Sequence, residues 1–287
     1  MPQIALITPA GGHLPYLERG ENRKDVKPVQ TPFGRSHPIH TFQHGMVEFA
    51  VLSRRGEETV TVPQAKVPNQ ANIWALKVLG VTKVVSFASA WSLRNEISPG
   101  DLVMPEDILD LRGIRATFFE ERTGHDFRPN PLFCPEGRQA IWQSLSSSPF
   151  EPKVGAVHGV TPGQRQLTRS EAAALRALGA DTAGPSLAAE AFLARELELC
   201  YSSVLYIACW ADGTVDRPPA PGTPGEGLLS EEEASRVKLT ENGMPTLFME
   251  WLVDLYELPR ECPCKDTQLT AKRNGDLPED FRQWLRR

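Results

Sequence analysis

Short apolar runs alternate along the chain with longer segments in which apolar residues recur at helical spacing. The pattern predicts strands over Ile4 to Thr8, Met46 to Ser53, Val84 to Ala88, Leu102 to Met104, Lys153 to Val160 and Val204 to Cys209. It predicts helices over Asn69 to Leu79, Glu136 to Leu145, Ser170 to Leu178, Ser186 to Glu198 and Ser230 to Glu257. Because strands alternate with helices, we expect an α/β sheet with helices on both of its faces.

Two segments show neither the apolar runs of a strand nor the apolar spacing of a helix. Residues 213–227 are rich in Pro and Gly, which exclude regular helix and strand, so they form either a surface loop or a lid over a site. The charged segment 261–287 is expected to wrap loosely and to end in a short helix over Pro278 to Leu285. We therefore divide the chain into a domain of residues 1–260 and a C-terminal tail of residues 261–287.

Composition and charge narrow the class of protein. A chain of 287 residues with 40% hydrophobic and 23% charged residues is long enough for a sizeable globular core. Its net charge of −5 and the lack of a basic stripe argue against nucleic acid as a partner. No apolar run approaches the roughly 20 residues of a membrane span, and the N-terminus lacks the basic start of a signal peptide. We expect a cytoplasmic protein that does not associate with membranes.

The five cysteines are Cys134, Cys200, Cys209, Cys262 and Cys264. Only one residue separates Cys262 from Cys264, which is tighter than the usual zinc spacing, and no second pair stands beside them in the sequence. Reduced thiols are the ordinary state in a cytosolic protein. We therefore expect free thiols and no metal site.

The segment 67–101 carries three motifs in a fixed order. Residues 70–77 read Q-A-N-I-W-A-L-K, residues 92–94 read S-L-R, and residues 99–101 read P-G-D. This run resembles the 5'-methylthioadenosine phosphorylase branch of the purine nucleoside phosphorylase family. The resemblance implies a phosphorylase-type three-layer α/β/α fold with a central mixed, partly barrel-like sheet. It also implies a small-molecule substrate, phosphate as a candidate co-substrate with no other cofactor, and a homotrimer whose subunits share their active sites.

The resemblance places an anion site at two strand ends. The family motif R-H-G appears here as Arg54-Arg55-Gly56, so Arg54 matches the phosphate ligand and Arg55 stands where histidine is usual. A solvated turn is the alternative interpretation of the two arginines. The N-M-T segment that grips the ribose appears as Gly184-Pro185-Ser186, which keeps a hydroxyl for an anion and loses the methionine. Glu190 matches a glutamate of the family and is a candidate structural residue.

Other positions depart from the family pattern. The first loop, usually G-G-[ST]-G, corresponds to residues 8–13, where the hydroxyl is lost unless Thr8 replaces it. In the strand end T-A-C-G-S-L-R the phosphate-binding threonine is replaced by Ala88, with Ser89 as a stand-in. Trp91 fills a glycine position and adds bulk beside the substrate.

The last departure concerns the acid over the purine base. The family strand end T-D-x-D corresponds to Ala208-Cys209-Trp210-Ala211-Asp212. If the segment is aligned with the family motif without a gap, Cys209 and Ala211 replace the two aspartates. If the alignment is shifted by one residue, Asp212 matches the second aspartate and Trp210 replaces the first. Asp212 is therefore the candidate catalytic acid or base, and we expect phosphorolysis of methylthioadenosine to be absent or very weak.

Three functions remain open. The chain is a diverged enzyme acting on a small, nucleoside-like molecule, a repurposed cyclase, lyase or isomerase that uses the same pocket, or a non-catalytic binding or regulatory homologue. The two strand-end tryptophans either line the pocket or simply fill the core. The predicted catalytic residue is Asp212. The predicted substrate contacts are Ser89, Trp91, Pro185, Cys209 and Trp210, and the predicted anion contacts are Arg54, Arg55 and Ser186.

Overall fold

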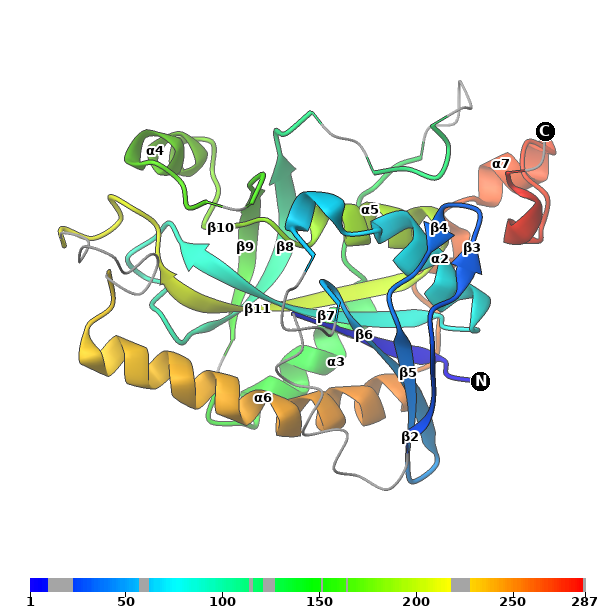
Figure 1. Cartoon of the computed structure of the whole chain (residues 1–287), viewed down its shortest axis with the longest axis horizontal. Helices are drawn as coiled ribbons and strands as arrows, with labels where there is room; N and C mark the ends of the chain where they lie inside the picture. Colours follow the sequence, from blue (N-terminus) through cyan, green and yellow to red (C-terminus); the bar gives the residue numbers. More distant parts are fainter. Residues whose placement is uncertain are drawn as a thin grey trace.

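Within the part of the chain that the computed structural model describes, a nine-stranded mixed sheet forms the centre of the molecule (Figure 1). The described residues are 1–9, 23–56, 62–113, 116–120, 127–150, 152–163, 165–217 and 228–285. The strand order is β10-β9-β8-β11-β7-β1-β6-β5-β2. The strands are β1 (Ile4–Thr8), β2 (Arg23–Lys27), β5 (Ile39–His44), β6 (Val47–Ser53), β7 (Lys83–Ser92), β8 (Leu102–Asp110), β9 (Lys153–Val160), β10 (Thr182–Gly184) and β11 (Cys200–Trp210), and a separate pair joins β3 (Gln30–Thr31) to β4 (Gly34–Arg35).

One part of the sheet closes on itself. Strand β10 pairs in parallel with β9 and also antiparallel with β7, so β7, β11, β8, β9 and β10 form a closed ring of strands. Strand β8 runs antiparallel to β11, whereas the pairs β1–β6, β1–β7 and β7–β11 are parallel. This confirms the prediction of a mixed, partly barrel-like sheet.

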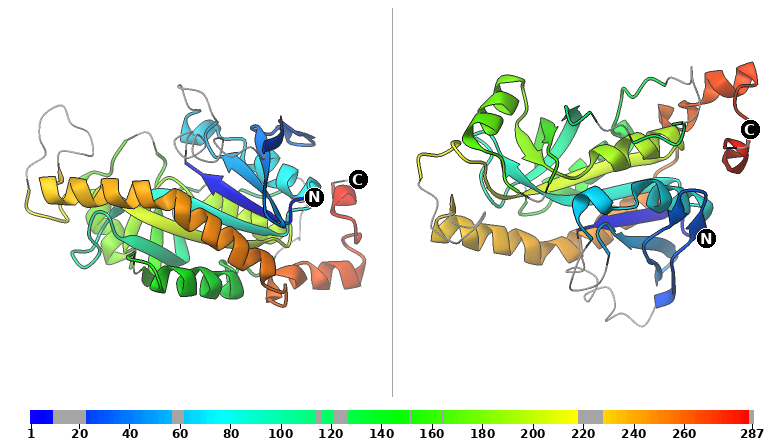
Figure 2. Two further views of the ribbon diagram at one scale, coloured as in Figure 1. Left: turned by 90° about the horizontal axis from the view of Figure 1, so that it is seen from below. Right: turned by 45° about the horizontal axis from the view of Figure 1, so that its top comes forward.

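Helices cover both faces of the sheet, as the alternating pattern predicts (Figure 2). Helices α3 (Pro135–Ser146) and α6 (Glu231–Glu257) pack together on one face and bury residues such as Phe248 against the sheet. Helices α2 (Asn69–Val78) and α5 (Ala188–Glu196) pack together on the other face. The remaining helices are α4 (Arg169–Ala177), α7 (Leu269–Asn274) and the 3-10 turns η1 (Gln64–Lys66), η3 (Pro263–Asp266) and η4 (Phe281–Gln283). None of the described helices is long and apolar enough to cross a membrane.

The long helix α6 begins at a capping box. The Ser230 side chain accepts a hydrogen bond from the Glu233 backbone, and the Glu233 carboxylate accepts one from the Ser230 backbone. Three glutamates in the first turn favour the positive end of the helix dipole. The predicted span Ser230 to Glu257 therefore agrees with the structure to within a residue.

The P-G-D turn, residues 99–101, precedes β8 and packs against α6. Gly100 has φ +89, and a Cβ atom there would lie 2.9 Å from Cβ of Arg236. The Thr240 hydroxyl donates to the Gly100 carbonyl at 2.7 Å, and Arg236 forms an ion pair with Asp101 at 2.7 Å. Glycine is required here because the helix backbone approaches too closely for a side chain.

Several predicted boundaries differ from the structure. Strands β7, β8 and β11 are longer than predicted, and β2, β5 and β10 were not predicted. Helix α5 was predicted from Ser186 and begins instead at Ala188, because Leu187 has φ +78, outside the helical region.

The expectation of a loosely held tail is wrong. Leu277, Phe281 and Trp284 are buried in the same core as Trp74, and the rings of Phe281 and Trp74 lie 5.1 Å apart. Apolar burial of this kind holds a terminal segment on a domain. The short helix predicted over Pro278 to Leu285 is represented only by the 3-10 turn η4.

Candidate functional site

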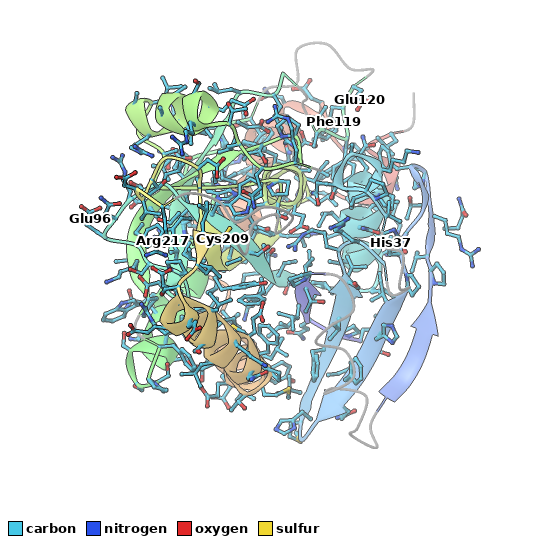
Figure 3. All side chains as sticks on the ribbon, turned by 60° about the vertical axis from the view of Figure 1, so that its left-hand side comes forward. His37, Glu96, Phe119, Glu120, Cys209 and Arg217 are labelled. Atoms are coloured by element: carbon cyan, nitrogen blue, oxygen red, sulfur yellow. The ribbon has the colours of Figure 1, made fainter. Side chains whose placement is uncertain are left out.

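A groove of about 650 Å³ lies between α6 and the carboxyl ends of β7 and β11. Trp91 enters it from β7 and Cys209 from β11, and these two residues are register partners in the parallel ladder. Figure 3 shows Cys209 close to the first turns of α6. The other lining residues are Gln166, Ala208, Leu229, Ser230, Glu231, Ala234, Val237, Lys238 and Glu241. Ligands of open α/β sheets gather at strand ends of this kind.

A larger hollow of about 820 Å³ lies elsewhere, between the loop after α3 and the second half of α6. Ser148, Phe150 and Met249 are among its lining residues. It contains none of the strand-end residues singled out by the sequence. We therefore place the candidate site in the smaller groove, where the strand ends converge.

The alternation of β7 separates the predicted residues onto two faces of the sheet. Ala88 packs in the core layer that contains α5, whereas Phe87 packs in the layer that contains α6. Ser89 and Trp91 follow Phe87 at intervals of two and therefore face α6. The predicted substrate contacts of β7 thus lie on the groove side.

Arg54 is engaged in a buried network on the other face. Its guanidinium forms a two-point ion pair with the Glu190 carboxylate, in which Nη2 lies 3.1 Å from Oε2. It also donates to Ser86 Oγ at 2.6 Å and to the Phe87 carbonyl at 3.0 Å. The Tyr201 hydroxyl donates to the same Glu190 carboxylate at 2.9 Å. An external anion would have to compete with Glu190, so anion binding by Arg54 stays a prediction.

The other predicted anion contacts lie outside the groove. Arg55 donates from Nε to the Val62 carbonyl at 2.9 Å. Pro185 and Ser186 follow β10, and Pro185 packs near Gly163, where an added Cβ would lie 3.1 Å from the proline ring. Their roles toward a ligand stay predictions, as does that of Arg55.

The end of β11 combines a neutral thiol with a carboxylate. Burial raises the pKa of Cys209 to about 12, and the nearby charge of Asp212 adds to the shift. The thiol is therefore protonated at neutral pH and acts as an apolar wall rather than a nucleophile. Asp212 is partly exposed beside it.

Trp210 faces the start of α6 and does not line the groove. Its indole Nε1 donates to Glu233 Oε1 at 3.1 Å, and Arg217 forms an ion pair with the other oxygen of Glu233 at 2.5 Å. The indole and Arg217 thus bind one carboxylate and fix the end of β11 against α6.

Ser89 is connected to the groove through Tyr206, its register partner on β11. Burial raises the pKa of Tyr206, and Glu241 of the groove adds to this shift, whereas Ser89 opposes it. Tyr206 therefore lies between Ser89 and a carboxylate that lines the groove.

Three buried polar groups lie at or near strand ends, and of these only Thr8 was named from the sequence, as a replacement for the hydroxyl of the first loop. In the described part of the chain, the hydroxyls of Thr8 and Thr161 and Nε2 of His158 have no hydrogen-bond partner. Thr8 lies opposite Ser53 in the β1–β6 ladder. Burial lowers the pKa of His158 to about 4, so its ring is neutral at pH 7. Sequence marks such residues as polar, but only the structure shows that they are buried and unpaired.

Some predicted features lie outside the described residues. They are positions 10–13 of the first loop and residues 218–227 of the Pro- and Gly-rich segment with its lid hypothesis.

The expectation that no second pair of cysteines lies beside Cys262 and Cys264 is wrong in three dimensions. Cys134 and Cys200 lie next to them in a buried cluster, although both are far away in the sequence.

The fold and the strand-end groove can be compared with known proteins. The family model described as "Phosphorylase superfamily" matches residues 3–236. The chain belongs to the phosphorylase superfamily. Two curated relatives from Thermococcus kodakarensis are both 32% identical: a probable 6-oxopurine nucleoside phosphorylase, over 93% of this chain and 97% of the relative, and an S-methyl-5'-thioadenosine phosphorylase, over 94% and 99%.

Solved structures show the same fold. A methylthioadenosine phosphorylase from an antarctic soil metagenomic library superposes with a TM-score of 0.79 at 23% identity, over 93% of this chain and 90% of that chain. An adenosine/methylthioadenosine phosphorylase mutant from Schistosoma mansoni, in complex with adenine, gives a TM-score of 0.80 at 21% identity, over 96% and 100%. The predicted phosphorylase-type fold is therefore confirmed.

Proposed function

We propose that this member of the superfamily is an enzyme that binds a nucleoside-like small molecule in the groove between β7, β11 and α6, with chemistry that differs from standard methylthioadenosine phosphorolysis. The observation that carries the proposal is the convergence of Trp91 and Cys209 in one groove at paired strand ends. The names of the 32% identical relatives support a purine nucleoside as the substrate class.

The lining of the groove suits a planar base. An indole face such as that of Trp91 offers a stacking surface for a heteroaromatic ring. The neutral Cys209 thiol adds an apolar wall, while Glu241 and Lys238 supply polar groups on the α6 side. This combination of an apolar surface with a few polar groups is typical of small-molecule sites.

The altered chemistry follows from the carboxylates at the end of β11. A departing purine is stabilised by an acid that protonates or hydrogen-bonds its N7 atom. Cys209 holds its proton too tightly for this task, and Ala211 offers no functional group. Asp212 is the first carboxylate that follows β11 in the sequence. It is not among the residues that line the groove, and it is our candidate for the acid or base.

Phosphate remains a candidate co-substrate. The Thr8 hydroxyl is buried at the carboxyl end of β1 and has no partner among the described residues. Leu6 packs on the α6 side of the sheet, so Thr8, two residues further on, faces the same side as the groove. A phosphate oxygen would satisfy this hydroxyl.

A homotrimer is part of the proposal. It is supported by the resemblance of the segment 67–101 to a branch that assembles as trimers. Closed symmetric assemblies are common among soluble enzymes. Light scattering at micromolar concentration is expected to give three times the mass of the chain, and the mass of a monomer would contradict the proposal.

The test is a screen of purine and methylthio nucleosides, with and without phosphate, by thermal shift and by product release. We expect at least one nucleoside to raise the melting temperature and to be converted. Asp212→Asn should lower turnover about a hundredfold, whereas Asp216→Asn, an exposed aspartate in the following segment, should leave it unchanged. If no nucleoside is converted, the proposed function is contradicted; if Asp212→Asn keeps full activity, the acid lies elsewhere.

A further inference from the structure

Four of the five cysteines meet at the amino end of β11. Cys134 is the N-cap of α3, Cys200 is the first residue of β11, and Cys262 and Cys264 flank Pro263 at the start of η3. Their sulfur atoms all lie within 4.8 Å of one another, and each residue is at most 5% exposed. The groove is formed at the other end of β11, which at about 3.3 Å per residue is roughly 30 Å away.

The spacing of the sulfur atoms suits one tetrahedral ion. A Zn–S bond of about 2.3 Å implies sulfur–sulfur distances of about 3.8 Å in a tetrahedron. The Sγ atoms of Cys200 and Cys262 lie 3.2 Å apart, and no sulfur–sulfur distance exceeds 4.8 Å. A disulfide would need about 2.05 Å. The tetrahedral sulfur–sulfur distance therefore lies between the Cys200–Cys262 distance and the largest separation within the cluster.

The surroundings suit thiolate ligands. Four thiolates around a divalent ion leave a net charge of −2, which needs positive neighbours in a buried position. Arg260 donates from Nε to Cys200 Sγ at 3.4 Å, and Lys83 lines the same small hollow as Cys134 and Cys200. The backbone N–H of Gly137, in the first turn of α3, donates to Cys134 Sγ at 3.4 Å. Hydrogen bonds of this kind orient metal ligands and stabilise their charge.

We propose that Cys134, Cys200, Cys262 and Cys264 bind a structural Zn²⁺ ion. Four protein ligands leave no open position, so the site is structural rather than catalytic. Each thiol that binds releases its proton to solvent. The ion would join the C-terminal segment to β11 and α3, and so hold in place the part of the tail that buries Phe281 and Trp284 in the core.

The first experiment measures zinc in the full-length protein, purified without chelators, by mass spectrometry of the metal. We expect one equivalent per chain. Alkylation of the denatured protein, with a chelator and without reductant, should then modify all five cysteines. If only Cys209 reacts, the cluster holds two disulfides and the proposal is overturned. If five thiols react but the native protein contains no zinc and takes up none from a zinc solution, it is overturned as well.

Matched variants locate the ion. Cys264→Ser should lose the equivalent of zinc and lower the melting temperature, whereas Cys209→Ser, which changes the cysteine outside the cluster, should keep the zinc. Retention of a full equivalent in Cys264→Ser would contradict the proposal. If Cys264→Ser does not fold, the zinc content and thiol count of the unaltered chain still decide the question.

Discussion

The Arg54 guanidinium and the Glu190 carboxylate form a two-point ion pair that is almost completely shielded from solvent, with side chains 2% and 5% exposed. Ser86 and Tyr201 donate further hydrogen bonds to the same carboxylate. The pair joins the end of β6 to α5 through the centre of the sheet. Arg54, which the family resemblance predicts to bind an external anion, is thus paired with the carboxylate of Glu190.

Breaking this pair should destabilise the fold. Arg54→Ala leaves the Glu190 charge buried without its cation, which costs about 3–5 kcal/mol in comparable cases. The measurement is urea unfolding followed by circular dichroism. Arg165→Ala removes an exposed partner of Glu171 and should leave the unfolding midpoint unchanged. Equal, small effects of the two substitutions would contradict the structural role of Arg54.

Gly100→Ala should destabilise the fold by disrupting the packing of the P-G-D turn against α6. The new Cβ would combine a positive φ with a close approach to Arg236, and the two effects together should cost about 2–4 kcal/mol. Gly275→Ala is the control, because Gly275 also has a positive φ of +80 but open space around it, so only the backbone strain of about 1 kcal/mol applies. Thermal unfolding of both variants measures the difference, and equal losses would refute the close packing.

Glu196 should make stability depend on pH. Burial raises its pKa to about 7, although the Phe118 backbone N–H donates to its carboxylate at 2.7 Å. Between pH 4.5 and 7 the folded state binds more protons than the unfolded state, so stability falls as pH rises through this window, by about 3 kcal/mol, and is level above it.

The pH effect is measured as a difference between variants. Glu196→Gln should remove that fall from urea unfolding curves recorded across the window. Arg165 lowers the pKa of Glu171 to about 2, below the window, so Glu171→Gln should keep the wild-type profile. An unchanged slope in Glu196→Gln would show that Glu196 does not titrate there.

Trp91 should contribute to ligand binding. Trp91→Ala removes the stacking surface of the groove and should weaken binding of a purine nucleoside by about 1–3 kcal/mol, measured by calorimetry with a nucleoside from the screen. Trp142→Ala is the control, since Trp142 is partly exposed on α3 and does not line the groove. Equal affinities for both variants and the wild type would place the ligand elsewhere.

The sequence predicts the fold where the apolar pattern is strong. Strands β1 and β9 have the predicted bounds, and in β1 the run I-A-L-I is uniformly apolar and buried. Strand β5 was missed because its sequence I-H-T-F-Q-H mixes histidines with apolar residues, and β10 because it has only three residues. Pairing partners far away in the chain define such strands, and periodicity does not reveal them.

The site is only partly predictable for a related reason. Trp91 and Cys209 meet in one groove as strand ends of an α/β sheet should, although their contact with a substrate stays a prediction. The engagement of Arg54 by Glu190 and the meeting of four cysteines depend on side-chain packing between remote segments. Neither spacing nor composition contains that information.

The most direct test of the proposed function is adenine release from methylthioadenosine by the unaltered protein in the presence of phosphate. In either alignment of this strand end with the resembled family, the first aspartate is replaced, by Cys209 or by Trp210. We therefore expect no release, or a rate far below the typical turnover of about 1–1,000 per second. Another nucleoside should still bind or be converted. Adenine release within that typical range would contradict the altered chemistry and make the protein an ordinary methylthioadenosine phosphorylase.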